Sequence, residues 1–381
     1  MEQLKECIGI INEVSPFDKY FAELEMLYDK ICIFGMGSYG TEILPILKKK
    51  LGNRIRCVSD NDKNKHGKEY CGIKCVPPHE LDKNTYIFVS IFQADDIIAE
   101  LSAKGFYVIN QELQNSFDLF RLYGFRQSGK LYTENYEGLE KVFSLFSDDL
   151  SRQIFIRRIQ YNILPYENKR FFDTVYSGDQ YFPDDIITLN DNETFIDGGG
   201  YTGDTIQNFI ARTKSNFNSI YSFEVDEKNY AIMNAYIKTL PENLSQKIFI
   251  FQYGLSNQEE KIKLIGNGAS THVQKVGGVF SDNFGKLVAL DNVVSNKSSV
   301  SFIKLDIEGY ERNALIGMME TIKNSKPKMA VCIYHKPEDV YEIPLLLHEM
   351  NPAYRFFLRH HGHDWNYAGE TVLYVIPEKN I

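Results

Sequence analysis

Three carboxylates stand directly after short apolar runs in the second half of the chain. Asp197, Glu224 and Asp306 follow the runs at residues 194–196, 219–223 and 301–305. Each run predicts a short buried strand. The carboxyl ends of successive parallel strands meet at one edge of a sheet, where the ligands of open α/β sheets bind. We therefore expect the three acids to line one crevice.

A glycine-rich segment follows the first of these acids. It contains Gly198–Gly200, Thr202 and Gly203, and the sequence from Asp204 onwards predicts a helix. A strand, a glycine turn and a helix place bare backbone beside a ligand. The turn has no basic residue, and Asp197 and Asp204 are acidic, so it suits a ligand with a cationic centre, an amine and a ribose better than a pyrophosphate. An acid at the end of the next strand can accept both ribose hydroxyls. This pattern is typical of S-adenosylmethionine (SAM) binding.

The ordered motifs of this half of the chain resemble those of FkbM-family methyltransferases. The motifs lie at residues 197–205, 223–224, 290–291, 303–311, 327–335 and 370–374. The resemblance covers roughly residues 181–377 and implies a SAM-dependent methyltransferase with a class I, Rossmann-like, seven-stranded α/β sheet. It also implies a set of cofactor-binding residues, namely Asp197, Gly198, Gly199, Gly200, Thr202, Gly203, Asp204, Glu224, Gly254, Asp306 and Glu308.

Methyl transfer to a hydroxyl requires that the hydroxyl lose its proton at or near the transition state. His335 follows the strand predicted at 329–334, one strand over from Asp306. In one interpretation His335 is the general base and Asp306 orients it, since imidazole titrates near neutrality. In the other, Asp306, His335 and His361 or Glu370 hold a divalent metal, Mg²⁺ or Mn²⁺, which acidifies the hydroxyl.

Further polar residues near the carboxyl terminus are candidate substrate contacts. His360, His361 and Glu370 are the main candidates, while Arg355, Arg359 and Trp365 could bind a phosphate or stack on a sugar. Each also has a plain structural interpretation. The histidines of the 360–363 segment are typical of a polar surface, and the arginines of an exposed strand face. Glu308 could serve only to cap the helix that is predicted to begin near Tyr310.

A second glycine motif lies near the amino terminus. Gly35, Gly37 and Gly40 follow a predicted strand at 30–34, and Asp60 ends the next strand, 20 residues after Gly40. This is a dinucleotide-binding fingerprint in its expected context. The segment 60–67 with Val76-Pro77 resembles nucleotide-binding domains of sugar-modifying enzymes. We weigh two interpretations equally: a site for a nucleotide or nucleotide sugar, and a Rossmann-like fold whose glycines serve only the turn.

These motifs predict two Rossmann-like units in series. We expect a small α/β domain at residues 1–110, a helical connector at 111–175 that packs the two domains together, and the methyltransferase domain at 176–381. In the last of these we expect seven strands, an extra hairpin strand at 261–265 and a mobile glycine-rich loop over the site at 267–284. The final two strands, with no helix between them, predict an antiparallel hairpin.

The composition of the 381 residues limits the possible partners. The hydrophobic fraction of 43% and the charged fraction of 24% are those of a globular protein. A net charge of −9 argues against nucleic acid as a partner. We expect neither a membrane span nor a signal peptide in this sequence. Six scattered cysteines, several in predicted strands, indicate reduced thiols and a cytoplasmic location. A homo-oligomer is left open.

The sequence thus favours a SAM-dependent O-methyltransferase. Its expected acceptor is a hydroxyl of a sugar or glycan precursor, as in capsule or lipopolysaccharide biosynthesis, because the amino-terminal segment resembles domains of sugar-modifying enzymes. The alternative is a nucleotide-sugar-binding or NAD-dependent sugar-modifying enzyme that uses Gly35, Gly37, Gly40 and Asp60. A scaffold without catalysis is a third hypothesis, for which the crevice beside Asp197 would be filled by its own loops.

Overall fold

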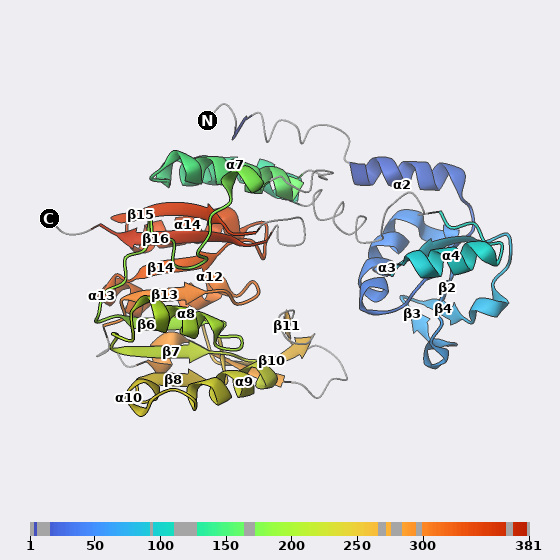
Figure 1. Ribbon diagram of the computed structural model, residues 1–381. Helices are drawn as coiled ribbons and strands as arrows, with labels where there is room; N and C mark the ends of the chain where they lie inside the picture. Colours follow the sequence, from blue (N-terminus) through green and yellow to red (C-terminus); the bar gives the residue numbers. More distant parts are fainter. Residues whose placement is uncertain are drawn as a thin grey trace. The chain divides into compact units, whose positions relative to one another are not determined.

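The computed structural model divides into two compact units (Figure 1). It describes residues 4–5, 16–91, 94–109, 128–163, 172–265, 272–275, 284–294, 299–362 and 369–378. The larger unit comprises residues 1–5, 134–160 and 166–381, and the smaller comprises 6–133 and 161–165. Each unit has its own sheet and its own hydrophobic core, so each is described separately.

The larger unit is built on a seven-stranded sheet with the order β15-β16-β14-β13-β6-β7-β8. Its strands are β6 (Thr194–Gly198), β7 (Ser219–Phe223), β8 (Ile248–Phe251), β13 (Phe302–Leu305), β14 (Lys328–Cys332), β15 (Tyr354–His360) and β16 (Thr371–Pro377). The strands from β8 to β14 are parallel. Strands β6 and β13 are buried along their whole length, as expected for central strands covered on both faces.

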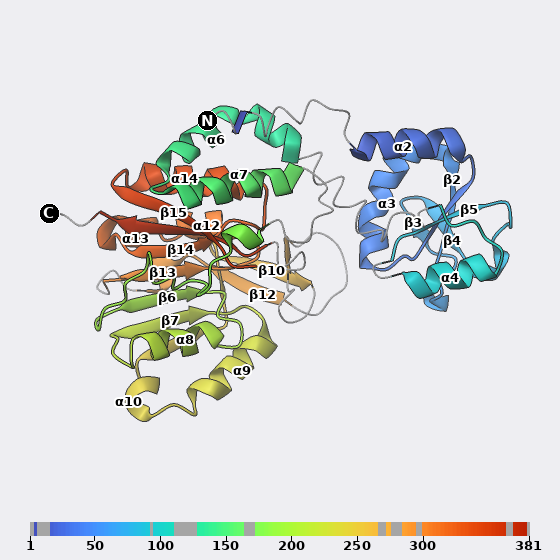
Figure 2. The same ribbon diagram turned by 45° about the horizontal axis from the view of Figure 1, so that its top comes forward.

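The last two strands form the antiparallel hairpin that the sequence predicts. Strand β16 pairs antiparallel with both β14 and β15. Helix α6 (Tyr136–Leu145) and the part of α7 (Asp149–Ile163) up to Gln160 belong to this unit, and α6 packs against α14 (Asp339–Met350). Figure 2 shows α6, α7 and α14 gathered at the β15 end of the sheet. The remainder of the predicted connector, residues 111–127 and 164–171, lies outside the described residues.

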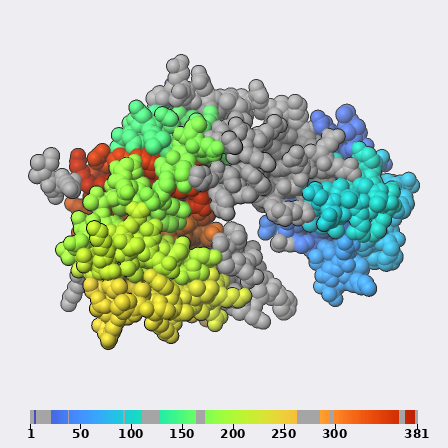
Figure 3. Space-filling model, in the orientation of Figure 1, coloured from blue at the N-terminus to red at the C-terminus, as the bar shows by residue number. Residues whose placement is uncertain are grey.

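The remaining helices connect the parallel strands. They are α8 (Asp204–Arg212), α9 (Glu227–Ile237), α10 (Glu242–Ser245), α11 (Leu290–Val293), α12 (Glu311–Ile316) and α13 (Met319–Ser325), with a 3₁₀ turn η5 (Asp173–Val175) before β6. In Figure 3, α9 and α10 form the yellow surface beside β7 and β8. The core contains a ladder of stacked rings, in which Phe195 lies 4.6 Å from Phe209 and 5.2 Å from Phe302. These rings fix α8 against β6 and therefore fix the turn between them.

A four-stranded sheet is inserted between β8 and β13. Its strands are β9 (Gly254–Leu255), β10 (Glu260–Ile265), β11 (His272–Lys275) and β12 (Phe284–Val288), in the order β11-β10-β12-β9. The extra strand predicted at 261–265 is β10, which pairs antiparallel with β11 and β12. The predicted loop at 267–284 instead contains β11, and its residues 267–271 and 276–283 lie outside the described part of the chain.

The smaller unit has a five-stranded sheet with the order β3-β4-β2-β1-β5. Its strands are β1 (Ile31–Phe34), β2 (Ile55–Ser59), β3 (Glu69–Tyr70), β4 (Ile73–Val76) and β5 (Tyr86–Val89). Its helices are α2 (Pro16–Leu27), α3 (Ser38–Leu51) and α4 (Asp95–Ala103), with 3₁₀ turns η2 (Gly52–Arg54), η3 (Lys63–Lys65) and η4 (Pro78–Glu80). Strand β1 pairs in parallel with β2 and β5, which is a Rossmann-like arrangement.

Candidate functional site

The turn between β6 and α8 needs glycine because other backbone segments approach it closely. Gly199 has φ +80°, and a Cβ there would lie 1.9 Å from the carbonyl oxygen of Asp306. A Cβ on Gly200 would lie 2.2 Å from Ser222 Oγ. Gly203, the N-cap of α8, has φ +89°. Because the glycines have no side chains, the turn packs closely against the neighbouring strands, and the space over the strand ends stays open for a ligand.

Glu224 stands at the end of β7 with both oxygens fixed by backbone groups. Tyr201 N–H donates to Oε2 and Asp226 N–H donates to Oε1, each at 2.8 Å. Burial raises the pKa of the Glu224 carboxyl, and the two backbone N–H groups offset part of that rise. A carboxylate held in this way still has lone pairs for the hydroxyls of a ligand.

Asp197, by contrast, is completely buried and faces a buried lysine. Its Oδ1 lies 3.2 Å from Lys304 Nζ, and its Oδ2 accepts a hydrogen bond of 2.9 Å from Ser222. Lys304 Nζ also donates to the carbonyl oxygens of Gly198 and Gly199, at 3.1 and 2.5 Å. Burial alone would lower the pKa of Lys304, but Asp197 and Asp306 raise it, so the ammonium stays charged. Asp197 therefore positions the turn through Lys304.

A cavity of about 300 Å³ lies over these strand ends. The lining residues are Gln180, Tyr181, Gly199, Tyr201, Asp204, Thr205, Phe223, Glu224, Val225, Asn229, Gly254, Leu255, Leu287, Lys304, Asp306, Ile307, Glu308, Tyr310, Tyr334 and Glu370. Of the predicted cofactor residues, six line the cavity: Gly199, Asp204, Glu224, Gly254, Asp306 and Glu308. Asp197, Gly198, Gly200, Thr202 and Gly203 do not, and their place is in the turn that supports it.

Asp306 presents both oxygens to tyrosine hydroxyls at the cavity wall. Tyr181 donates to Oδ2 at 2.6 Å and Tyr334 donates to Oδ1 at 3.2 Å. Burial alone would raise the pKa of Asp306, but the charges of Lys304 and His335 and the bond from Tyr181 hold it below its usual value. Asp306 is therefore an ionised carboxylate within the cavity.

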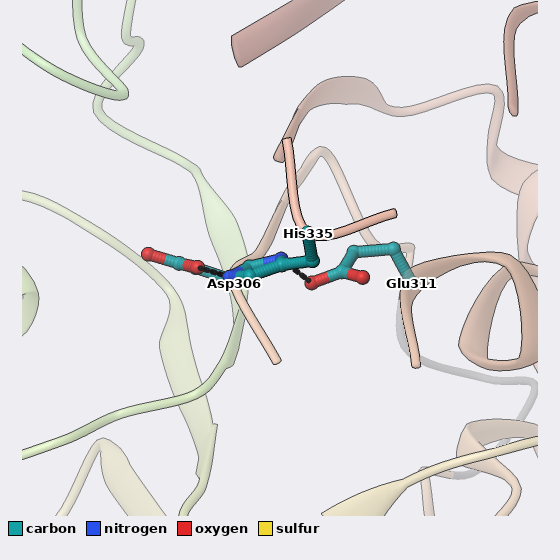
Figure 4. Close-up of side chains that lie close together, drawn as sticks. All are labelled: Asp306, Glu311 and His335. Atoms are coloured by element: carbon teal, nitrogen blue, oxygen red, sulfur yellow. Dashed lines mark ion pairs between the residues drawn. The ribbon is translucent and has the colours of Figure 1, made fainter. Parts of the chain in front are cut away.

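His335 lies among three carboxylates, and Figure 4 shows two of them, Asp306 and Glu311, on either side of its ring. Its Nε2 lies 3.5 Å from Asp306 Oδ1 and 3.8 Å from Glu308 Oε2, and its Nδ1 lies 2.9 Å from Glu311 Oε1. Burial alone would lower the pKa of His335, but the charges of Glu311, Asp306 and Glu308 raise it to about 9. The expected proximity of Asp306 and His335 is thus present, and Glu311 is an additional member of the group.

The other histidines named from the sequence lie elsewhere. His361 contacts Ser177 O with Nδ1 and the Tyr374 hydroxyl with Nε2, both at 2.8 Å. Because both ring nitrogens are engaged there, His361 does not complete a metal site with Asp306 and His335. His360 is fully buried, stacks on Phe172 at 3.8 Å, and has its pKa lowered to about 2 by burial and the charge of Arg158.

His360 is therefore a core residue, contrary to its predicted substrate contact. Arg359 is also buried, with its guanidinium bound to Asp148 and Asp185 at 2.8 and 2.6 Å, so it does not offer a phosphate site. Arg355 is exposed. Glu370 lines the cavity and accepts a hydrogen bond from Gln180. His363 and Trp365 lie outside the described residues.

The glycines of the smaller unit have different surroundings from one another. A Cβ on Gly40 would lie 1.9 Å from the Gly35 carbonyl oxygen, and Gly35 has φ +102°. A Cβ on Gly37, in contrast, would meet no atom of the described residues within 4 Å. Asp60 is engaged: Met36 N–H donates to it at 2.6 Å, Asp62 N–H at 2.8 Å and Lys65 Nζ at 2.8 Å. Gly35 and Gly40 are thus required by the backbone geometry of the turn, whereas the position of Gly37 has open space beside it.

Several residues of the site escaped the sequence analysis. Tyr181, Lys304, Glu311 and Tyr334 are all in or beside the cavity. A signal was present for Lys304, because a lysine in the middle of a buried strand requires a carboxylate partner. A signal was present for Glu311 too, since an acid in the first turn of a helix can fold back onto the preceding loop. Tyr181 comes from a distant segment and only the fold brings it here.

The fold and the site together define a class of protein. The strand order, the antiparallel final hairpin, the glycine turn after β6 and the acid after β7 are the architecture of class I SAM-dependent methyltransferases. The comparisons with known proteins agree. Residues 197–364 match the model of the methyltransferase FkbM domain. The search of curated proteins finds no match.

Among solved structures, the chain is similar to the methyltransferase FkbM from Methylobacillus flagellatus KT, with a TM-score of 0.62 and 16% identity over 98% of each chain. It is also similar to an rRNA methylase from Streptococcus thermophilus, with a TM-score of 0.32 and 13% identity over 50% of this chain and 89% of that one. A SAM-dependent methyltransferase from Aquifex aeolicus gives a TM-score of 0.28 and 13% identity over 49% and 82%.

Residues 197–364 thus match the FkbM methyltransferase domain, and this match supports a SAM-dependent methyltransferase. In the part of the chain that the structure describes, no helix has the length and apolar composition needed to cross a bilayer.

Proposed function

We propose that the protein methylates a hydroxyl of a sugar or glycan precursor. The observation that supports SAM binding best is the position of Glu224, which lines the cavity beside the Gly199 turn with both oxygens held by backbone N–H groups. Bound SAM supplies an electrophilic methyl group, so the S–CH₃ bond breaks while an O–CH₃ bond forms. The residues of the chain must hold the acceptor and take its proton.

The proton is assigned to the pair of Asp306 and His335. Asp306 lines the cavity, and His335 Nε2 lies 3.5 Å behind it. The hydroxyls of Tyr181 and Tyr334 fix the Asp306 carboxylate, which favours a single orientation. Glu370, on the same cavity wall, is the candidate acceptor contact. Near neutral pH the raised pKa of about 9 keeps His335 protonated, so an acceptor hydroxyl that enters between Glu370 and Asp306 would lose its proton to the Asp306 carboxylate.

Calorimetry tests the cofactor part of the proposal. The full-length protein should bind SAM and S-adenosylhomocysteine at one site. Asp306→Asn and His335→Asn should each lower turnover by about two to four powers of ten, the usual size of a general-base contribution, and His335→Asn should retain SAM binding. A wild-type protein that binds neither ligand would refute the proposal. Turnover that persists in both variants would remove the pair from the mechanism.

The identity of the acceptor rests on the resemblance of the smaller unit to domains of sugar-modifying enzymes. Mass spectrometry of glycans from cells with and without the protein should show a loss of methylated sugar in its absence. Unchanged methylation of every glycan fraction would contradict a sugar acceptor and leave SAM binding unaffected. A cytoplasmic location fits this role, and buried free thiols such as Cys32 and Cys332 fit a reducing compartment.

A second candidate function concerns the smaller unit. The open space at Gly37, next to the start of α3, favours a nucleotide or nucleotide sugar there. Equilibrium dialysis of the full chain with UDP-glucose and with NAD would test it, using Gly37→Val as the variant that fills the space. Binding that is lost in Gly37→Val supports the site. No binding by the wild type leaves Gly35, Gly37 and Gly40 as turn residues alone.

A further inference from the structure

We propose that Asp306, Glu311 and His335 form a binding site for one divalent cation of the Mg²⁺ or Mn²⁺ type. One ligand atom from each of these residues lies within 4.8 Å of the ligand atoms of the other two. They come from the end of β13, the start of α12 and the segment after β14, and Figure 4 shows the His335 ring between the two carboxylates. Neither the FkbM match nor the proposed methyl transfer requires this site.

Unsatisfied buried atoms are the independent evidence for a missing ligand. The side chain of Glu311 is fully buried and that of His335 is 10% exposed. Glu311 Oε2 and His335 Nδ1 have no hydrogen-bond partner of acceptable geometry among the described residues, although Nδ1 lies only 2.9 Å from Oε1. Buried polar atoms are normally satisfied, and leaving them unpaired is costly. A cation that displaces a proton from the His335 imidazole would satisfy both atoms.

The charges around the three residues also favour a bound cation. Glu308 lies 3.8 Å from the imidazole, and Asp339 and Glu370 are further acids whose pKa values respond to His335. The two nearest lysines have other partners. Lys304 binds Asp197 and two carbonyl oxygens, and Lys336 donates to Gly309 O. The cluster is therefore rich in negative charge, and Lys304, whose charge also lowers the pKa of Asp306, is shared with Asp197 and two carbonyl oxygens.

The donor set selects the kind of cation. Two carboxylates and one imidazole suit Mg²⁺ and Mn²⁺ better than soft metals, which prefer thiolates. Asp306 is the most exposed of the three, at 22% of its side chain, and it also lines the cavity. A cation would thus be reached from the cavity side. If the proposed O-methylation holds, a cation here would lower the pKa of the acceptor hydroxyl.

Electron paramagnetic resonance of Mn²⁺ tests the site without any catalytic assay. The full-length protein is stripped with EDTA and titrated with MnCl₂, and bound Mn²⁺ is measured by the loss of the free-ion signal. One saturable site per chain is expected. Glu311→Gln and His335→Asn should each weaken binding at least tenfold. Glu320→Gln, which removes an exposed acid from α13, is the matched control and should bind as the wild type does.

A second measurement on the wild type keeps the test decisive if a variant does not fold. Pulsed electron spin-echo spectra of the Mn²⁺ complex should show modulation from a coordinated imidazole nitrogen. Absence of saturable binding, of the nitrogen modulation, or of any effect of Glu311→Gln in folded protein would overturn the proposal. SAM calorimetry on the same samples separates the two proposals. SAM binding without Mn²⁺ binding would contradict only the metal site. Mn²⁺ binding without SAM binding would contradict only the proposed cofactor function.

Discussion

The glycine turn after β1 and the glycine turn after β6 both donate a backbone N–H to the carboxylate that follows the next strand. They differ in whether a lysine also pairs with that carboxylate. In the smaller unit, Asp60 accepts hydrogen bonds from Met36 N–H and Asp62 N–H. In the larger unit, Glu224 accepts the corresponding bonds from Tyr201 N–H and Asp226 N–H. Asp60, however, also forms an ion pair with Lys65 at 2.8 Å.

Glu224 has no such ion pair among the described residues, and it lines a cavity. The turns also differ in length, since α3 begins three residues after Gly35 (38 − 35) and α8 begins five residues after Gly199 (204 − 199). The longer turn leaves room over the strand ends. A strand, glycine turn and acid are therefore insufficient to define a cofactor site, and the partner of the acid decides whether its oxygens remain available to a ligand.

The largest expected effect follows from removing the available acid. Glu224→Ala should weaken SAM binding by about 2–4 kcal/mol, roughly 30- to 700-fold, because hydrogen bonds to a charged acceptor are lost. Asp60→Ala is the matched control and should leave SAM affinity unchanged. Calorimetry with SAM measures both. Equal losses of SAM affinity in the two variants would show that the two turns do not differ in their role in SAM binding.

The N-cap glycines of α3 and α8 offer a second comparison. Gly203 has φ +89°, and a Cβ there would lie 3.2 Å from Met233, so Gly203→Ala should cost about 1–2 kcal/mol of stability. Gly37 has φ −77° and open space around it, so Gly37→Ala should cost less than about 1 kcal/mol. Urea unfolding measures both. A larger loss for Gly37→Ala would show that the smaller turn is as constrained as the larger one.

The two acids should also give opposite dependences of stability on pH. The pKa of Asp60 is lowered, because Lys65 and the backbone N–H groups outweigh burial. Its contribution is present above the unfolded pKa of about 3.9 and is lost as pH falls. The pKa of Glu224 is raised by burial, so the folded state binds more protons, and stability falls as pH rises above about 4.3.

Urea midpoints of the wild type, Asp60→Asn and Glu224→Gln between pH 3 and pH 7 would measure these slopes. The stability of the wild type relative to Asp60→Asn should increase with pH, and that relative to Glu224→Gln should decrease. Each slope is limited to about 1.4 kcal/mol per pH unit for one proton. Slopes of the same sign would mean that the surroundings of the two acids are alike.

Much of the larger fold follows from local patterns in the sequence. The strands predicted near 194–196, 219–224 and 301–306 are β6, β7 and β13, because buried parallel strands are continuous apolar runs. The inserted sheet was predicted only in β10. Short strands such as β11 and β12 have no apolar periodicity of their own and are stabilised by pairing with β10. The helix predicted to begin near Tyr310 is divided at Gly317, where a Cβ would lie 2.0 Å from Ser256 O.

The candidate site was harder to predict because its chemistry depends on distant contacts. Asp306 and His335 were expected together since their strands are adjacent. The engagement of His361 with Tyr374 depends on strand pairing that alternation alone does not fix. Tyr181 reaches Asp306 from 125 positions away. Such contacts depend on tertiary packing, and so does the need for glycine at 199 and 200, although the run of glycines marks the turn in the sequence.

The smallest expected effect concerns Lys65, whose ammonium group pairs with the acid beside the glycine turn of the smaller unit. Lys65→Met removes the partner of Asp60, whose ion pair is partly exposed, with 24% of the lysine side chain accessible. The expected cost is about 0.5–1 kcal/mol, and it should shrink in 1 M salt because exposed ion pairs are weak and screened. Urea unfolding at low and high salt measures it, with Lys63→Met, an exposed neighbour in η3, as the control. SAM affinity should not change in either variant. A cost well above this range, insensitive to salt, would mean that Lys65 is essential to the fold of the smaller turn and that its acid was never free to bind a ligand.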